Sequence, residues 1–191
     1  MTEALDSREM TEAERCTNFL MACGKYDKVS RSARANLGRA RVLFSEFESS
    51  ASVNFADEDG WSAAHHACGE GHLAVLEFLT ESTPININLV DSSGCTPLWY
   101  AAFNDKRECV KHLLRFGADE SIKGQPVGEP LVSPALAARR NRHPGLGDLI
   151  DAEAELRKAD PERIVKQRSG EMSVEEFRES LRVSLKPTES I

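Results

Sequence analysis

Residues 91–119 read DSSGCTPLWYAAFNDKRECVKHLLRFGAD, and residues 57–79 read DEDGWSAAHHACGEGHLAVLEFL. In both stretches an aspartate is followed at the fourth position by a glycine, Gly60 or Gly94, and the offset between them is 34 residues (91 − 57). A serine or threonine, a run of small residues and a leucine-rich second half follow in the same order. A repeat of this length predicts a stack of similar structural units.

Each part of the repeated pattern has a structural reason. Asp-x-x-Gly is typical of a tight turn, because glycine reaches backbone conformations that cost other residues energy. Thr96 is predicted to cap a helix that begins at Pro97, where a missing amide hydrogen does no harm. Gly71 is predicted to end the equivalent helix, and Leu76 and Leu79 face inward from the next one at helical spacing. The unit is therefore predicted to be a hairpin loop followed by two antiparallel helices.

These segments resemble a known family. TPLWYAAFNDKRECVKHLLRFGAD (residues 96–119) closely resembles the ankyrin consensus, and WSAAHHACGEGHLAVLEFL (residues 61–79) resembles it with Ala63 and Ala64 in place of the usual proline and leucine. The resemblance implies an all-α ankyrin-repeat helical solenoid, made of helix-turn-helix units with short β-hairpin loops and followed by a C-terminal helical extension. Trp99 stands where the family has a histidine, and we expect it to pack between repeats.

Two further copies are degenerate. SPALAARRNRHPGLGDLI (residues 133–150) is in register at an offset of 37 from Thr96 (133 − 96), so the hairpin before it is expected to be longer. NFLMACGKYDK (residues 18–28) and RARVLFSEF (residues 39–47) read as the two helices of an N-terminal copy, with residues 29–37 as an insertion. The predicted divisions are a disordered tail (1–11), a degenerate N-terminal capping repeat (12–56), two full repeats (57–90 and 91–123), a degenerate C-terminal capping repeat (124–151) and a charged extension (152–191).

The charged extension ends in a helical pattern at residues 173–185. Ser173 and Glu176 form a predicted capping box. Apolar residues follow at a spacing of three to four: Val174, Phe177, Leu181 and Leu185. In one interpretation this stripe caps the last repeat, because so short a helix is marginally stable alone. In the other it docks into a groove of a partner, with the segment between residues 151 and 173 as a linker.

Composition narrows the classes of partner and compartment. The net charge of −7, from 24 basic and 31 acidic residues, argues against nucleic-acid binding, since phosphate neutralisation needs a basic surface. It favours a basic or neutral protein partner. The basic run at residues 28–41 is interpreted as a solvated helix face, with contact to an anionic partner as the alternative.

Five widely spaced cysteines without C-x-x-C suit a reducing compartment. The acidic N-terminus resembles neither a signal nor a transit peptide, and no run approaches the roughly 18 apolar residues of a membrane span. We expect a cytoplasmic protein, with nuclear or cytoskeletal association as alternatives and no membrane partner.

One cluster invites a metal-site hypothesis: His65, His66, Cys68 and His72. In the ankyrin pattern the residue at His65 is a structural hydrogen-bonding histidine, and His72 belongs to the Gly-His pair that closes the helix. A zinc site needs three or four converging ligands. No nucleophile motif, phosphate-binding loop or dinucleotide fingerprint is present. We therefore expect no enzyme activity, no cofactor, no bound metal and no small-molecule substrate.

The resemblance also implies where a partner binds, namely at the hairpin tips and the exposed side of the first helices. Carried over residue by residue, these positions are Glu58, Asp59, Trp61, His66, Glu70, Ser92, Ser93, Cys95, Tyr100, Phe103 and Asn104. Trp61 and Tyr100 are the expected anchors, because aromatic residues often dominate binding energy. For Trp61, packing over a neighbouring hairpin is the alternative. Acidic residues surround them: Glu58, Asp59 and Glu70.

The expected function is protein-protein interaction, as an adaptor, scaffold or assembly subunit that is monomeric alone. A regulatory inhibitor that masks a basic surface or active cleft is the first alternative. A metal-dependent enzyme is the remote one. An inhibitor would differ from a scaffold in that its partner loses activity on binding. A metal-dependent enzyme would differ in that the purified protein contains metal.

Overall fold

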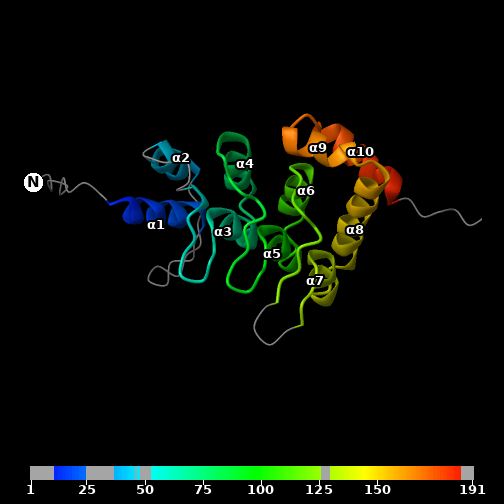
Figure 1. The fold of residues 1–191 in the computed structure, drawn as a ribbon, viewed down its shortest axis with the longest axis horizontal. Helices are drawn as coiled ribbons and strands as arrows, with labels where there is room; N and C mark the ends of the chain where they lie inside the picture. The colour runs from blue at the N-terminus through cyan, green and yellow to red at the C-terminus, as the bar shows by residue number, and fades with distance from the viewer. Residues whose placement is uncertain (1–10, 25–36, 46, 48–52, 126–129, 186–191) are drawn as a thin grey trace, which may run out of the picture.

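The computed structural model describes residues 11–24, 37–45, 47, 53–125 and 130–185, in which ten α-helices are present. The first eight helices form four antiparallel pairs that stand side by side along one axis (Figure 1). The pairs are α1 (Glu12–Cys23) with α2 (Leu37–Ser45), α3 (Ala63–Glu70) with α4 (Leu73–Ser82), α5 (Pro97–Phe103) with α6 (Arg107–Arg115), and α7 (Pro134–Arg140) with α8 (Pro144–Ala159). The predicted all-α ankyrin solenoid is confirmed by this arrangement.

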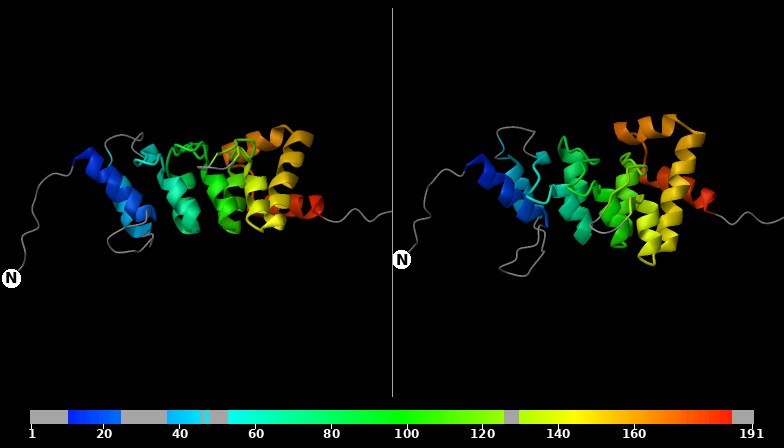
Figure 2. Two further views of the ribbon diagram at one scale, coloured as in Figure 1. Left: turned by 90° about the horizontal axis from the view of Figure 1, so that it is seen from below. Right: turned by 60° about the horizontal axis from the view of Figure 1, so that its bottom comes forward.

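The first helices of the pairs form one row and the second helices another, while the hairpins project from the side of the first helices (Figures 1 and 2). Among the sequence predictions, most of the disordered tail, most of the insertion at residues 29–37 and the tip of the last hairpin at residues 126–129 lie outside the described residues. Within the described part of the chain, none of the helices has the length and apolar character that crossing a bilayer requires.

The predicted helix caps are present. The Thr96 hydroxyl accepts a hydrogen bond from the Trp99 amide at 3.2 Å, and Pro97 occupies the first turn of α5. Ser133 caps α7 in the same way, accepting from the Leu136 amide at 3.3 Å. Such caps stabilise a helix by about 1 kcal/mol each, because they satisfy amide groups that the helix leaves without an acceptor.

The hairpins are called fingers below, and the first two are each built by an aspartate and a glycine. In the first finger (residues 56–62) and the second (residues 91–95), Gly60 and Gly94 have φ of 83° and 71°, a conformation in which glycine is favoured. The Asp91 carboxylate accepts bonds from the amides of Ser93 at 2.9 Å and Cys95 at 2.8 Å. The third finger closes with a bridge between residues 124 and 132.

The fingers are joined to each other along the array. The Ser92 amide and hydroxyl donate to the Asp59 carbonyl at 3.2 and 2.8 Å, and the Gln125 amide donates to the Ser93 carbonyl at 2.8 Å. These bonds therefore link the first finger to the second, and the second to the start of the third.

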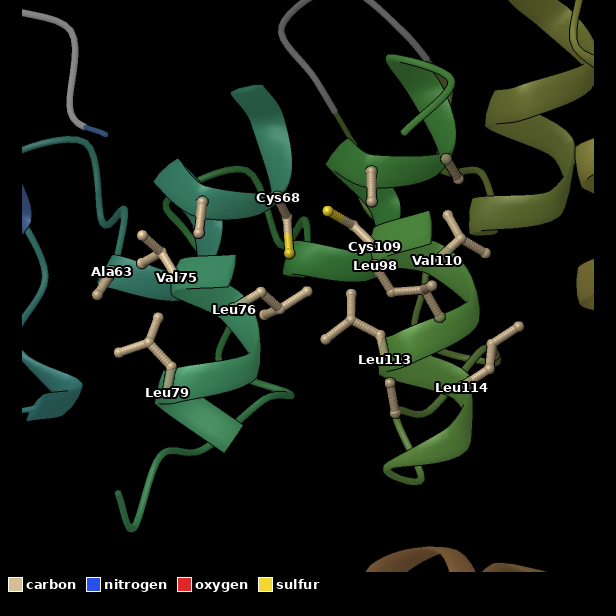
Figure 3. Close-up of a cluster of buried hydrophobic side chains, with 14 of the residues drawn as sticks. Ala63, Cys68, Val75, Leu76, Leu79, Leu98, Cys109, Val110, Leu113 and Leu114 are labelled. Atoms are coloured by element: carbon tan, nitrogen blue, oxygen red, sulfur yellow. The ribbon is translucent and has the colours of Figure 1, made fainter. Parts of the chain in front are cut away.

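The apolar core runs between the helix pairs without a break. Leu76 and Leu79 of α4 and Leu113 of α6 are fully buried, together with Leu98 of α5 (Figure 3). Each fully buried leucine stabilises the fold by roughly 1.5–3 kcal/mol relative to an exposed one. The predicted inward-facing leucines of the second helices are therefore confirmed.

The C-terminal extension corrects the sequence interpretation. The segment between residues 151 and 173 was interpreted as a linker, but α8 continues to Ala159 and is followed by α9 (Glu162–Ser169). α10 (Val174–Ser184) then packs against α8. The reason is a buried polar cluster around Glu153, whose partners come from α8 and α9 and were not recognisable as a pattern in the sequence.

The apolar stripe of α10 is largely used within the chain. Phe177 and Leu181 are 2% and 5% exposed, so they cap the array and are not available to a partner. Val174 and Leu185 remain exposed. The docking-helix hypothesis is therefore wrong for the two central residues, because their side chains already lie in the core.

Arg157 fastens the extension to the array. Its guanidinium donates to the carbonyls of Leu114 at 2.8 Å and Ala118 at 2.7 Å, at the C-terminal end of α6, and also pairs with Glu120. A cation at the C-terminus of a helix is favourable because the exposed carbonyls carry partial negative charge. This contact holds α8 and α6 in a fixed relation.

Candidate functional site

A groove of about 610 Å³ opens on the finger side of the array. One side is aromatic and consists of Trp61, Trp99, Tyr100 and Phe103, with Asn104 beside them. The other side comes from the third finger and α7 and consists of Pro130, Val132, Ala137, Arg140 and Asn141. A mostly apolar lining with a few polar groups is typical of binding sites.

Trp61 is held in place by its neighbours. Its ring centroid lies 4.3 Å from that of Tyr100, and its indole lies so close to Gly69 that an added Cβ there would be 3.3 Å from the ring. The side chain is half-buried. Trp61 therefore presents a fixed aromatic face to the groove, while part of its surface packs on Gly69 of its own repeat and on Tyr100 of the next. These contacts differ from the packing over a neighbouring hairpin that the alternative interpretation expected.

Two aspartates anchor the residues that lie nine positions after them. The Tyr100 hydroxyl donates to Asp91 Oδ2 at 2.6 Å, and His66 Nε2 lies 3.0 Å from Asp57 Oδ2 at the equivalent position. Burial, followed by the hydrogen bond to Asp91, raises the pKa of the Tyr100 hydroxyl above its ordinary value, so Tyr100 remains neutral and acts as a donor. The Asp91 carboxylate thus holds both a finger turn and the groove wall, and the Asp57 carboxylate holds the first finger and the buried His66.

Trp99 takes over a role that a histidine performs one repeat earlier. His65 Nδ1 accepts from the Ser62 amide at 3.1 Å, and its Nε2 lies 3.1 Å from the Cys95 carbonyl of the next finger. Trp99, 34 positions later (99 − 65), is 3% exposed and its indole donates to the Val132 carbonyl at 3.2 Å. The predicted packing of Trp99 between repeats is confirmed, and its hydrogen bond to the next finger explains how the replacement is accommodated.

Asparagines connect the ends of the first helices. The Asn104 amide donates to the Gly69 carbonyl at 3.2 Å, and the Asn141 amide donates to the Phe103 carbonyl at 2.5 Å. The two asparagines are equivalent in successive repeats. Each therefore closes the helix of the preceding repeat, and both lie at the edge of the groove.

The structure brings only part of the predicted surface to the groove. Of the predicted residues, four line it: Trp61, Tyr100, Phe103 and Asn104. Five others are exposed or half-buried outside its lining: Glu58, Asp59, Glu70, Ser92 and Ser93. His66 is nearly buried.

Cys95 corrects the prediction. Its side chain is fully buried beneath the second finger, and the third finger covers it so closely that an added Cβ on Gly124 would lie 2.3 Å from its Sγ. It therefore lies beneath the surface and not on it. Burial raises the pKa of its thiol to about 11, which leaves little of the reactive thiolate.

The histidine cluster has protein partners. His65 and His66 point to Cys95 and Asp57, and the Cys68 side chain lies in the core (Figure 3). Over the described residues no group of three or more histidine, cysteine, aspartate or glutamate side chains is arranged to hold a metal ion. Adjacent helical residues face different directions, which is why a sequence cluster does not become a cluster in space.

The third repeat supplies groove residues that the sequence interpretation missed. Arg140 and Asn141 stand 37 positions after Phe103 and Asn104 (140 − 103 and 141 − 104), so the repeat register was the signal that could have identified them. Val132 also lines the groove, and it belongs to the third finger, whose length differs from that of the other two. Its position could not be derived from the register alone.

The family is shown by direct comparison. A model of ankyrin repeats in three copies matches residues 16–123, more than half of the chain, and this match includes most of α1 and all of α2. The chain belongs to the ankyrin-repeat family. Ankyrin repeats are in general non-enzymatic modules for protein-protein interaction. The α7–α8 pair lies outside the matched range, but its cap and finger bridge repeat the geometry of the pairs before it.

Segments of the chain are similar to parts of three known proteins, one of which is named for its ankyrin repeats. The chain is 35% identical over 81 residues to human (Homo sapiens) BCL-6 corepressor-like protein 1, covering 42% of this chain and 4% of that protein. It is 41% identical over 66 residues to rat (Rattus norvegicus) oxysterol-binding protein-related protein 1, covering 34% and 7%. It is 33% identical over 90 residues to ankyrin repeat-containing protein P1E11.10 of Schizosaccharomyces pombe, covering 47% and 42%. The chain therefore spans less than half the length of each of these relatives.

Removing one hydroxyl tests the link between finger and groove wall. Tyr100→Phe is expected to lower the free energy of unfolding by about 1.5 kcal/mol, because a hydrogen bond to a buried carboxylate is lost. Urea unfolding followed by circular dichroism measures this. Ser82→Ala, which removes an exposed hydroxyl from the last residue of α4, is the control and should cost less than about 0.5 kcal/mol. Equal effects of the two substitutions would contradict the expected role of Tyr100.

Proposed function

We propose that this chain binds another protein through the aromatic groove and thereby acts as an adaptor, scaffold or assembly subunit. The observation that carries the proposal is the groove itself, an apolar hollow lined by Trp61, Tyr100 and Phe103 on the finger side. Aromatic side chains in such positions supply much of the binding energy of protein interfaces.

The groove is also rigid, which favours binding. Trp61 is held by Gly69 and Tyr100, and Tyr100 is held by Asp91. A wall that is already in place loses little conformational entropy when a partner binds. The ring of Phe103 stacks on Trp99 with centroids 5.1 Å apart and is 37% exposed, so it is the most accessible aromatic residue of the wall.

The test replaces an accessible groove residue without removing a buried bond. Phe103→Glu places a charge in the apolar lining and is expected to weaken partner binding at least tenfold, or roughly 1.4 kcal/mol. The matched control is Val165→Glu on α9, where the side chain is 64% exposed and lies outside the groove lining. Circular dichroism and thermal melting first establish that both variants are folded.

Affinity capture from native extract then compares the wild type with the two variants. The expected result is a partner that the wild type and Val165→Glu retain and Phe103→Glu loses, confirmed with the purified partner by isothermal titration. Retention of every specific partner by Phe103→Glu would contradict the proposal and direct attention to another face. Point substitution is preferable to truncation at Ser169, because truncation would uncover the core around Phe177 and Leu181.

A further inference from the structure

The turn of the second finger leaves one backbone amide for a neighbouring segment. The amides of residues 93–95 all bond to Asp91 within this turn. The Ser92 amide is not used there, and it donates to the Asp59 carbonyl of the first finger at 3.2 Å. The second finger is therefore joined to the first through the one amide that its own turn does not use.

The first finger has the same turn but an open edge on the side of α1. The amides of residues 59–61 bond to Asp57, so the unused amide is that of Glu58, which stands 34 positions before Ser92 (92 − 58). None of the described residues accepts a hydrogen bond from this amide. In the described part of the chain, only α1 and α2 precede this finger (Figure 1). A neighbour of the kind that Ser92 has is therefore missing at Glu58.

A hollow of about 390 Å³ lies at this open edge. Its lining combines Thr17 and Leu20 of α1 with residues 55–58, which lead into the first finger. Leu20 is 1% exposed and Phe55 is 37% exposed, so Leu20 lies at the base of the hollow and Phe55 is its accessible aromatic residue. An apolar side chain of a partner would lose contact with water between these two residues, which favours binding.

The charges at the hollow are negative. Asp57 and Glu58 are the ionisable residues of its lining. The Asp57 carboxylate is engaged by His66, whose Nε2 lies 3.0 Å away. Glu58 and Asp59 are exposed, and no basic side chain of the described residues forms an ion pair with either of them. These two carboxylates complement a basic group on a partner.

We propose that this surface, which we call the outer edge, binds an extended segment of another protein that contains an apolar residue and a nearby lysine or arginine. A backbone carbonyl of the segment accepts from the Glu58 amide, as the Asp59 carbonyl accepts from Ser92. The apolar side chain lies between Leu20 and Phe55, and the basic side chain faces Glu58. Unpaired backbone groups at an edge are a template for such pairing. The outer edge is separate from the aromatic groove and adds a second site to the proposed function.

Glu58→Pro tests the backbone bond directly. The Gly60 amide donates to the Asp57 carbonyl at 2.9 Å, so residues 57–60 form a turn in which Glu58 occupies the second position, where proline is favoured. Glu58→Pro removes both the amide hydrogen and the carboxylate, whereas Glu58→Ala removes only the carboxylate. Both variants should melt close to the wild type, because the Glu58 amide forms no bond within the described chain.

The binding test uses peptides selected on the wild type from a displayed library of random linear sequences, with synthetic copies titrated by calorimetry. One group is expected to carry an apolar residue near a lysine or arginine. Its affinity should fall at least about tenfold for Phe55→Ser, but not for the control Val42→Ser on α2, where the side chain is 57% exposed. Glu58→Ala should cost about threefold at low salt, and Glu58→Pro about fivefold more. Phe103→Glu should leave the affinity of this group unchanged.

The opposite results would overturn the inference. Equal affinities for Glu58→Pro and Glu58→Ala would contradict the backbone pairing, and a lack of peptides that distinguish Phe55→Ser from the wild type would contradict the site. A wild-type dimer that Phe55→Ser dissociates in ultracentrifugation would assign the outer edge to a second copy. Phe55-dependent binding of a synthetic peptide of residues 1–10 would assign it to the chain's own terminus. The proposed function is tested separately, by Phe103→Glu.

Discussion

Glu153→Ala should destabilise the protein by about 3–5 kcal/mol, because it removes the acceptor from a buried cluster of charged donors. Glu153 is fully buried, and its carboxylate accepts two bonds from Arg163, at 2.8 and 2.7 Å, and one from Gln167 at 2.6 Å. Arg157 Nε lies 3.3 Å from the same carboxylate. Without Glu153, two guanidinium groups would lie side by side with too little negative charge between them.

The loss is expected to be concentrated in the extension. Repeat arrays are stabilised mainly by contacts between neighbouring elements, so the α8–α10 region can lose structure while distant repeats remain folded. Thermal melting should show a fall in Tm on the order of 10 °C. Hydrogen exchange should be faster in α9 and α10 than in α3 and α5, and a partner that binds the groove should still be captured.

Glu155→Ala is the matched control for this substitution. Glu155 lies two residues away on the same helix and pairs with Lys158 at 2.6 Å, but both side chains are exposed. An exposed pair of this kind contributes roughly 0–1 kcal/mol, so this variant should melt close to the wild type. If Glu153→Ala melted as well as Glu155→Ala, the cluster would not be what holds the extension in place.

Acidification should destabilise the protein through His112 by about 3 kcal/mol between pH 7 and pH 4. His112 is 7% exposed, its Nε2 lies 2.7 Å from Thr80 Oγ1, and its ring stacks on Phe116 at 4.6 Å. Burial, with a smaller contribution from Arg115, lowers its pKa from 6.5 to about 4. The folded protein therefore holds this histidine neutral at a pH where the unfolded chain binds a proton.

The direction follows from proton linkage. Between pH 6.5 and about pH 4 the unfolded chain binds more protons at this site, so stability is present above pH 6.5 and is lost as the pH falls toward 4. The separation of the two pKa values corresponds to about 3 kcal/mol. Urea unfolding of the wild type and His112→Gln at both pH values measures the difference.

The glutamine variant serves as the reference because its amide is neutral throughout this range, while carboxylates titrate alike in both proteins. The wild type should lose about 3 kcal/mol more than His112→Gln on acidification. Parallel losses in the two proteins would show that His112 titrates normally in the folded state, against its observed burial.

The repeat architecture could be predicted because its determinants are local and recur. The turns at Gly60 and Gly94, the cap at Thr96 and the leucines of the second helices each depend on residues within a few positions. Because the turns, the cap and the leucines all recur at the same offset, the repeat unit could be identified from the sequence. The positions of the exposed fingers could be predicted from the same repeat offset.

The wrong predictions concern residues that contact parts of the chain far away in the sequence. Cys95 was expected on the surface because the family resemblance places its position at a hairpin tip, but the third finger covers it. The linker interpretation failed because a segment rich in charge reads as solvated, and only the folded chain brings Arg163 and Gln167 onto Glu153. A charged residue becomes a core residue only when its partner is present.

The sequence by itself therefore determined the repeat unit, its turns and caps, the inward leucines and the aromatic residues available for recognition, since short-range geometry and periodicity govern these features. Only the tertiary structure decided which aromatic residues form one groove, that α7 supplies Arg140 to its lining, and that the extension folds onto the array. Those outcomes depend on contacts between residues ten to more than forty positions apart, such as Arg163 with Glu153 and Arg157 with the Leu114 carbonyl. No local pattern records such contacts, because they exist only when the repeats have stacked.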